Sequence, residues 1–106
     1  MPSSARVVLV TVPRGGKAES LAEGAVEARL AACVNILPGV TSIYRWRGRV
    51  HRDSESLLVI KTTSARLKEL ERWIKARHPY ETPEFLVLPV TAGSKEYLAW
   101  LGEQAK

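Results

Sequence analysis

A short segment between two prolines gathers several side chains that could bind a ligand or a metal ion. It runs from His78 to Glu84 and reads HPYETPE. Proline fixes its own φ angle and restricts the residue before it, so the segment should hold its side chains in set directions. Imidazole and carboxylate groups are metal ligands, which makes His78, Glu81 and Glu84 candidates. A stiff connection between a helix and a strand, with its polar groups in water, would have the same composition.

Three other side chains could take part in binding from within predicted strands. The single cysteine, Cys33, is either a soft metal ligand or a small buried hydrophobe. Lys61 follows three apolar residues and either contacts an anion in a cleft or reaches solvent along its aliphatic stem. Asn35 either contacts a ligand or satisfies backbone groups at the end of a sheet. Each of the three therefore has a binding interpretation and a structural one.

Hydrophobic periodicity predicts the elements that would position these residues. Runs of β-branched and aliphatic residues predict strands, and apolar residues at helical spacing predict helices. The predicted order is strand, helix, strand, strand, helix, strand, followed by a terminal helix. The four strands are expected at Arg6–Val12, at Ala32–Leu37 continued beyond a bend at Pro38-Gly39 by Val40–Trp46, at Val50–Thr62 and at Phe85–Val90. The helices are expected at Lys17–Leu30, Ala65–Arg77 and Lys95–Leu101.

This order is that of a ferredoxin-like α+β sandwich with an extra C-terminal helix. Two βαβ units joined by a hairpin would form a four-stranded antiparallel sheet, with two helices on one face. The chain of 106 residues fits a single domain, 1–106, without a linker or repeat. The other face of the sheet also carries apolar residues, so the terminal helix or a neighbouring subunit should cover it.

The middle of the chain predicts an unusually long β-hairpin. Its arms are Val40–Trp46 and Val50–Thr62, and its tip is Arg47-Gly48-Arg49, where glycine supplies a positive φ angle. The second arm exceeds the usual strand length of about five or six residues. A domain this small cannot cover such arms alone, and exposed aromatic edges favour pairing with another chain. We therefore expect the outer half of the hairpin to dock on another copy of the chain.

The outer half of this hairpin mixes aromatic and basic side chains. Such a surface could stack on the bases of nucleic acids and neutralise their phosphates. RNA-binding domains with this order of elements carry aromatic residues on an inner strand, whereas the corresponding strand here, SESLLVIKTT, has none. Packing between subunits is therefore the better interpretation, and we do not expect nucleic acid as a partner. The residues concerned are Tyr44, Arg45, Trp46, Arg47, Arg49 and Arg52.

Composition bears on location and on stability. No apolar stretch approaches the roughly 18–20 residues of a membrane span, so we expect no membrane association. The N-terminus has no basic region ahead of an apolar core, so we expect no signal peptide. A single cysteine rules out an internal disulfide, which favours the cytoplasm. Few thermolabile residues, with one Asn and one Gln, indicate a thermostable protein.

Four ordered stretches resemble the CutA family of divalent-cation-tolerance proteins. They read ACVNILPGVTSIYRWRG at 32–48, LLVIKTT at 57–63, HPYETPE at 78–84 and LPVTAGSKEYLAWL at 88–101. The resemblance implies a ferredoxin-like fold and a tight homotrimer, in which the hairpin of each subunit reaches over its neighbour. It also implies an architecture similar to that of the trimeric nitrogen-regulatory signalling proteins, which bind small effectors in clefts between subunits.

The same resemblance implies binding of copper or another divalent cation in the response to metal ions. Ligand positions proposed in the family are a cysteine in the first strand and a histidine pair before Pro-Tyr. This chain has Val10 at the first position and Arg77-His78 at the pair, while Cys33 matches the cysteine of the family's AAC stretch. The implied metal ligands are His78, Glu81, Glu84 and Cys33. The residues implied to line an intersubunit cleft are Asn35, Tyr44, Trp46, Lys61, Tyr80, Tyr97 and Trp100.

Two functions are consistent with these observations. The first is a trimeric, cytoplasmic protein of metal tolerance that binds divalent cations. The second is a signalling or scaffold trimer that binds a small anionic effector or a partner protein, with Lys61 and the hairpin arginines as the positive groups. The chain has no P-loop, GxGxxG, GxSxG or CxxC motif, so we do not expect an enzyme.

Overall fold

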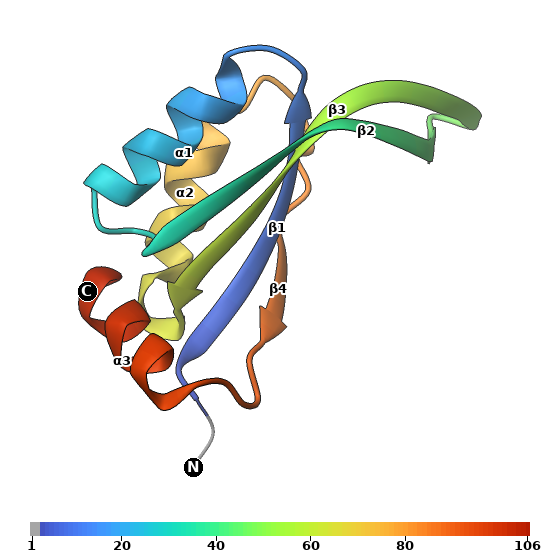
Figure 1. Ribbon diagram of the computed structural model, residues 1–106. Coiled ribbons are helices and arrows are strands. Elements are labelled where there is room, and N and C mark those ends of the chain that lie inside the picture. Colours follow the sequence, from blue (N-terminus) through green and yellow to red (C-terminus); the bar gives the residue numbers. More distant parts are fainter. Residues whose placement is uncertain (1–2) are drawn as a thin grey trace.

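The computed structural model describes residues 3–106 and contains one four-stranded antiparallel sheet with three α-helices (Figure 1). The strands lie in the order β2-β3-β1-β4, which confirms the predicted ferredoxin-like α+β class. Residues 1 and 2, part of the N-terminus for which no signal peptide is expected, lie outside the described residues. The elements are β1 (Ala5–Pro13), α1 (Lys17–Glu27), β2 (Cys33–Trp46), β3 (Arg49–Thr63), a 3₁₀ turn (Ser64–Arg66), α2 (Leu67–Arg77), β4 (Leu86–Pro89) and α3 (Lys95–Gln104).

One face of the sheet packs against α1 and α2, and the main core lies in this layer. Val8, Val10 and Val12 are fully buried and alternate along β1, because successive side chains of a strand point to opposite faces. They pack with Leu58 and Ile60 of β3 and with the small alanines of α1. Figure 1 shows the two helices side by side over this face.

Helices α1 and α2 approach each other where Gly24 faces Trp73. A Cβ atom at Gly24 would lie 2.7 Å from the Trp73 ring, so only glycine permits this approach. The Arg77 guanidinium lies 4.2 Å from the centroid of the Trp73 ring and donates a 3.0 Å hydrogen bond to the Trp73 carbonyl. Together these contacts hold Trp73 in one orientation between the helices.

The tip of the hairpin differs from the expected three-residue loop. Trp46 pairs with Arg49, so only Arg47 and Gly48 form the turn. Both have positive φ angles, 52° and 77°, which suits the primed turns that match the twist of the two strands. The expectation that Arg49 belongs to the tip was therefore wrong, because Arg47 adopts the left-handed conformation that the sequence indicated only for glycine.

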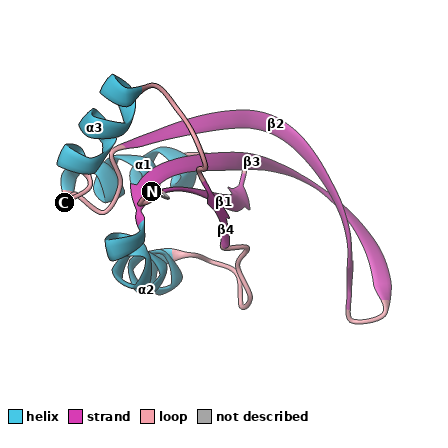
Figure 2. Cartoon of the chain, turned by 90° about the horizontal axis from the view of Figure 1, so that it is seen from below, coloured by secondary structure: helices cyan, strands magenta, loops and turns pink. Residues whose placement is uncertain are grey.

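Strand β2 is continuous across a proline that lies at its middle. The register shifts between Leu37 and Val40, and Gly39 within the shift has a φ angle of 72°. Pro38 lies within this shift of an edge strand and has no partner on β3, so its missing N–H is tolerated there. Beyond this bulge the hairpin leaves the body of the molecule (Figure 1) and curves along its length (Figure 2).

The C-terminal helix is held by a residue at the end of α1. α1 ends at Glu27 rather than at the expected Leu30, and Arg29 follows with a φ angle of 60°. From there Arg29 donates a 2.6 Å hydrogen bond to the carbonyl of Glu103 and a 3.3 Å bond to that of Lys106. The first bond satisfies a carbonyl group that the end of α3 leaves without a helical partner, and the second holds the residues that follow the helix.

The face of the sheet opposite α1 and α2 is apolar and largely uncovered. Val7 and Leu9 of β1 and Leu57 and Val59 of β3 are only partly buried. At the sheet edges Leu37, Leu86 and Leu88 are 44%, 56% and 47% exposed. The terminal helix α3 covers only the end of this face near Ala5, which packs with Leu101 and Ala105. Within residues 3–106 the rest of the face stays open, so a neighbouring subunit is still expected to cover it.

Candidate functional site

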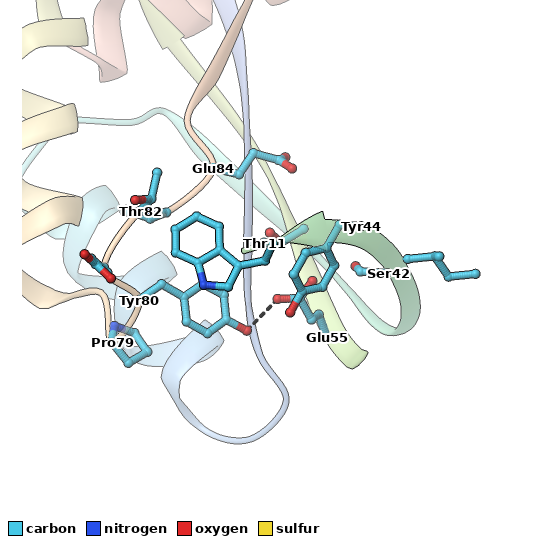
Figure 3. Close-up of a pocket in the computed structure, with 12 residues that line it drawn as sticks. Thr11, Ser42, Tyr44, Glu55, Pro79, Tyr80, Thr82 and Glu84 are labelled. Atoms are coloured by element: carbon cyan, nitrogen blue, oxygen red, sulfur yellow. Dashed lines mark hydrogen bonds between the residues drawn. The ribbon is translucent and has the colours of Figure 1, made fainter. Parts of the chain in front are cut away.

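A cleft opens at the base of the hairpin, on the uncovered side of the sheet. Its volume is about 710 Å³. Strands β1, β2 and β3 form one wall and the loop between α2 and β4 forms the other (Figure 3). The lining residues are Thr11, Ser42, Ile43, Tyr44, Trp46, Glu55, Pro79, Tyr80, Glu81, Thr82, Pro83 and Glu84.

Strand register brings polar and aromatic groups to the cleft from both arms of the hairpin. Ser42 pairs with Asp53 and Tyr44 with His51, so these four side chains share one side of the hairpin. The Tyr44 ring stacks on His51, and its hydroxyl donates a hydrogen bond to the Asp53 carboxylate. That bond, with some burial and the charge of Asp53, raises the pKa of Tyr44. Tyr44 is therefore held as a neutral wall of the cleft.

Glu55 is a buried carboxylate at the floor of the cleft. Its side chain and backbone together are only 5% exposed, and Tyr80 donates a 2.5 Å hydrogen bond to its Oε2 (Figure 3). Burial, followed by this bond and the charge of Glu55, raises the pKa of Tyr80 well above that of a free tyrosine. The phenol thus stays protonated and acts as a hydrogen-bond donor to the carboxylate.

Glu84 is a second carboxylate of the cleft, and its pKa is affected by Glu55. Burial is the main cause of its raised pKa, and the negative charge of Glu55 adds to it. No lysine or arginine lines the cleft among the described residues. Two carboxylates that face one cavity without a positive neighbour repel each other, and a cation between them would remove that repulsion.

His78 lies beside the cleft but uses both ring nitrogens within the fold. Its Nε2 is 2.8 Å from the Thr11 carbonyl, and its Nδ1 accepts a 3.1 Å hydrogen bond from the backbone N–H of Tyr80. The residue is 8% exposed, and its ring packs on that of Tyr80. These contacts assign the Nε2–H tautomer and make His78 a residue that positions Tyr80.

Glu81 contacts the hairpin tip. Arg47 donates a 3.1 Å hydrogen bond to its carboxylate, and both side chains are 72% exposed. An exposed pair of this kind contributes about 0–1 kcal/mol and is screened by salt. The contact therefore guides the hairpin tip toward the loop 78–84 without closing the cleft.

The remaining predicted site residues form a second group farther along the same face of the sheet. Lys61 pairs with Cys33 across the strands, and its ammonium group donates a hydrogen bond to the Asn35 side chain. Tyr97 and Trp100 of α3 lie together, with ring centroids 5.4 Å apart. Burial, and then the nearby Cys33 thiol, raise the pKa of Tyr97.

The predicted site residues therefore fall into two clusters. Lys61 and Glu55 share β3, and a rise of about 3.3 Å per residue separates them by roughly 20 Å. Cys33 consequently does not meet His78, Glu81 or Glu84 within one protomer. The sequence also failed to indicate Thr11, Ser42, Glu55 and Thr82. The only signal for Glu55 was a carboxylate separated by one serine, Ser56, from the apolar run of a predicted strand.

The chain matches the model of the CutA1 divalent ion tolerance protein family over residues 6–104. It belongs to that family. A divalent-cation tolerance protein CutA of Thermus thermophilus is 54% identical over 97 residues, which are 92% of this chain and 94% of that protein. Human Protein CutA is 44% identical over 101 residues, or 95% of this chain, but only 56% of the human protein is covered. The chain thus spans little more than half of its plant and animal relatives.

Solved structures of CutA proteins have the same fold. Cut A1 from Thermus thermophilus superposes with a TM-score of 0.94 at 51% identity and covers 96% of this chain and 99% of that one. A protein from Nostoc sp. described as PII-like CutA gives a TM-score of 0.88 at 34% identity, with 95% and 97% of the two chains covered. These similarities confirm the family predicted from the four sequence stretches.

Location differs among the CutA relatives. One from Archaeoglobus fulgidus is described as periplasmic and one from Arabidopsis thaliana as chloroplastic. Within residues 3–106 no helix combines the length and the apolar character that crossing a membrane requires. A cytoplasmic location therefore stays a prediction for this chain.

The family description names divalent ions, and the donor groups of this chain suit some ions better than others. Residues 3–106 contain no group of three or more His, Cys, Asp or Glu side chains arranged to hold a metal ion. A closed zinc site takes about four protein ligands, and Val10 at one family ligand position is buried in the core. The described protomer does not fit such a site. One or two carboxylates with water suffice for a hard ion such as Mg²⁺, which fits Glu55 and Glu84.

Proposed function

We propose that the protein acts in divalent-cation tolerance as a homotrimer whose acidic clefts bind divalent cations through carboxylate oxygens. The observation that carries this proposal is the pair Glu55 and Glu84, which face one cleft whose lining, among residues 3–106, contains no basic residue. The pair supplies oxygen ligands, and Tyr80 fixes one of them in direction. Water or a neighbouring subunit would complete the coordination, so binding should be reversible.

Copper ligation by His78 and Cys33 stays a prediction that needs a rearrangement. His78 would have to give up its contact with the Thr11 carbonyl or with the Tyr80 N–H before a ring nitrogen could reach a metal. Cys33 would have to receive its further ligands from another subunit. The carboxylate pair needs neither change, which is why we place the cation at Glu55 and Glu84.

The uncovered sheet face supports the homotrimer. Its partly buried and exposed leucines and valines continue to the aromatic side chains of α3, and Trp100 is 43% exposed. Apolar surfaces of this kind on a small domain mark an interface. The hairpin also exposes two large apolar side chains, Ile43 and Val50, by 63% and 65%. A second and third copy would bury both surfaces.

Native mass spectrometry of the full chain, titrated with Mn²⁺, Zn²⁺ and Cu²⁺, tests this function. We expect a trimer that takes up to one ion per cleft. Glu55→Gln and Glu84→Gln should each weaken Mn²⁺ binding by about tenfold or more, because ligand charge sets the affinity of such sites. Glu23→Gln, on the exposed side of α1, is the matched control and should bind like the natural protein. Unchanged affinity in both cleft variants would contradict the proposal.

A second candidate function is the binding of a small organic effector in the same cleft. Its support is the aromatic lining, Tyr44, Trp46 and Tyr80, in a volume typical of small-molecule sites. For an anionic effector the hairpin arginines are the nearest positive groups, because Arg47 already contacts Glu81 of the lining whereas Lys61 lies in the other cluster. A thermal-shift screen with nucleotides and other small anions tests this function. The absence of any rise in melting temperature would exclude the anionic effectors screened.

A further inference from the structure

A second cavity lies on the opposite side of the sheet, between the start of α1 and the bulge of β2. Its volume is about 490 Å³. The loop after β1, the first turn of α1 and two serines of β3 meet there. The lining residues are Arg14, Gly15, Ala18, Glu19, Ile36, Pro38, Gly39, Ser54 and Ser56.

The first turn of α1 leaves backbone donors free at this cavity. Gly16 occupies the N-cap position, and no side chain caps the helix. The first hydrogen bond of the helix runs from the Ser20 N–H to the Gly16 carbonyl, at 3.2 Å. The N–H groups of residues 17–19 therefore have no helical acceptor, and they add to the positive end of the helix dipole.

Ser56 is an independent indication that this cavity receives a ligand. It is 95% buried, since only 5% of its surface is exposed, and it lies on the helix-facing side of β3 with Leu58. Its hydroxyl makes no hydrogen bond to any of residues 3–106. Within the same residues, every side-chain N or O atom that is fully enclosed has a hydrogen-bond partner, so the Ser56 hydroxyl is not fully enclosed. The Ser56 hydroxyl must therefore open onto the cavity that it lines.

Arg14 gives the cavity an exposed positive group. It is exposed, lines the cavity and forms no ion pair within residues 3–106. Glu19 also lines the cavity, in the first turn of the helix, and is the only acidic residue that the described part of the chain contributes to the lining. An anion would thus meet one guanidinium, free backbone N–H groups and a serine hydroxyl, against one carboxylate at the rim.

We propose that this cavity binds a phosphate-type oxyanion, held by Arg14, the backbone N–H groups of residues 17–19 and the Ser56 hydroxyl. Helix N-termini bind such anions because free N–H groups and the dipole act together. A guanidinium adds charge-assisted hydrogen bonds of the strongest class. Glu55 and Ser56 are neighbours on β3 and point to opposite faces, so this anion site is separate from the acidic cleft.

Titration of the ¹⁵N-labelled full chain with inorganic phosphate, at ionic strength held constant with chloride, tests the site. A second titration with glycerol phosphate distinguishes a free ion from the phosphate group of a larger ligand. We expect saturable amide shifts centred on Lys17, Ala18 and Glu19. Whichever of the two probes binds tighter identifies the source of the phosphate group.

Four variants make the test specific. Arg14→Gln should weaken binding by about tenfold and Ser56→Ala by about threefold, the losses expected for a charged and a neutral hydrogen bond. Glu19→Gln should strengthen it, because it removes the competing carboxylate. Arg72→Gln, on the exposed side of α2, changes the net charge as Arg14→Gln does and should leave affinity unchanged.

Two results would overturn the proposal. One is the absence of saturable shifts at residues 17–19 with either probe in the millimolar range. The other is an equal loss of affinity in Arg14→Gln and Arg72→Gln, which would show attraction by net charge alone. Ser56→Ala removes a single oxygen from a side chain without hydrogen bonds, so a failure to fold is not expected to obscure the result.

Discussion

The Tyr80 hydroxyl donates a 2.5 Å hydrogen bond to the Glu55 carboxylate, and this contact joins the loop 78–84 to strand β3. The bond ties the two walls of the cleft together and gives the buried carboxylate a fixed direction. His78 helps to position Tyr80, because its Nδ1 accepts a hydrogen bond from the backbone N–H of Tyr80. The cleft is therefore organised around Glu55 rather than around the histidine that the sequence favoured.

Tyr80→Phe should lower the free energy of unfolding by about 1–2 kcal/mol, because the buried Glu55 carboxylate loses its donor. Chemical denaturation at one fixed protein concentration measures the loss. Tyr97→Phe is the control, since its hydroxyl bonds to no carboxylate within residues 3–106. Equal stability changes in the two variants would contradict the role given to the Tyr80–Glu55 bond.

Glu84→Gln should raise the melting temperature near pH 7 in the absence of divalent cations. Burial and the charge of Glu55 raise the pKa of Glu84 above the ordinary 4.5 in the folded state. Protonation of Glu84 therefore favours the folded state. This contribution to stability is fully present below the pKa of Glu84 in the unfolded state, and it is lost as the pH rises through the pKa in the folded state. The gain of the variant should therefore shrink below about pH 4.5, where Glu84 is protonated in both states.

Melting temperatures of both proteins, measured from about pH 4.5 to pH 7 with a chelator present, test the direction of this pH dependence. Glu23→Gln on exposed α1 should show little change at any pH. A gain for Glu84→Gln that grew toward acid pH would contradict the repulsion between Glu84 and Glu55. Added Mn²⁺ should stabilise the natural protein but not Glu84→Gln, and the stabilisation should strengthen with rising pH as protons cease to compete.

Gly24→Ala should destabilise the protein although alanine is the better helix former. The new Cβ would lie 2.7 Å from the Trp73 ring, and overpacking of this kind costs about 1–3 kcal/mol. Gly102→Ala in α3 meets no atom within 4 Å and should be neutral or stabilising by roughly 0.5–1 kcal/mol. Thermal unfolding of both variants measures the difference in stability. Stabilisation by both substitutions would show that the Trp73 ring moves aside for the new Cβ at little cost.

Removal of the Arg29 side chain should loosen the C-terminal helix. Arg29→Ala loses the hydrogen bonds to Glu103 and Lys106 and retains a strained φ angle of 60°. Arg29→Gly loses the same bonds without that strain, so it should be the more stable variant by about 1 kcal/mol. Hydrogen exchange of the α3 amides should accelerate in both. Unchanged exchange would contradict the role of Arg29 in holding α3.

Local patterns were sufficient to predict the order and type of the elements. β1 shows this best, since its alternation of buried valines matches the core face of the sheet. Deviations came where a residue adopts an unfavourable conformation because its tertiary contacts require it. Arg29 and Arg47 both have positive φ angles, and each of them shifts an element boundary.

The candidate site was only partly predictable, because it depends on contacts between distant segments. The loop 78–84 was identified from its prolines and polar residues. Its partner Glu55 was not, since a carboxylate within a strand gives no signal until strand register fixes its face. The inward orientation of His78 depends on the Thr11 carbonyl at the far end of β1, which no local pattern specifies.

Anomalous diffraction from crystals of the full chain soaked in Mn²⁺ tests the central claim most directly. The account predicts a trimer with an anomalous peak in each cleft, within about 2.0–2.6 Å of oxygens of Glu55 and Glu84, as for hard divalent cations. Glu55→Gln crystals should lose the peak. Peaks at Cys33 or at the His78 ring, or none in the cleft, would contradict the assignment of Glu55 and Glu84 as the cation ligands.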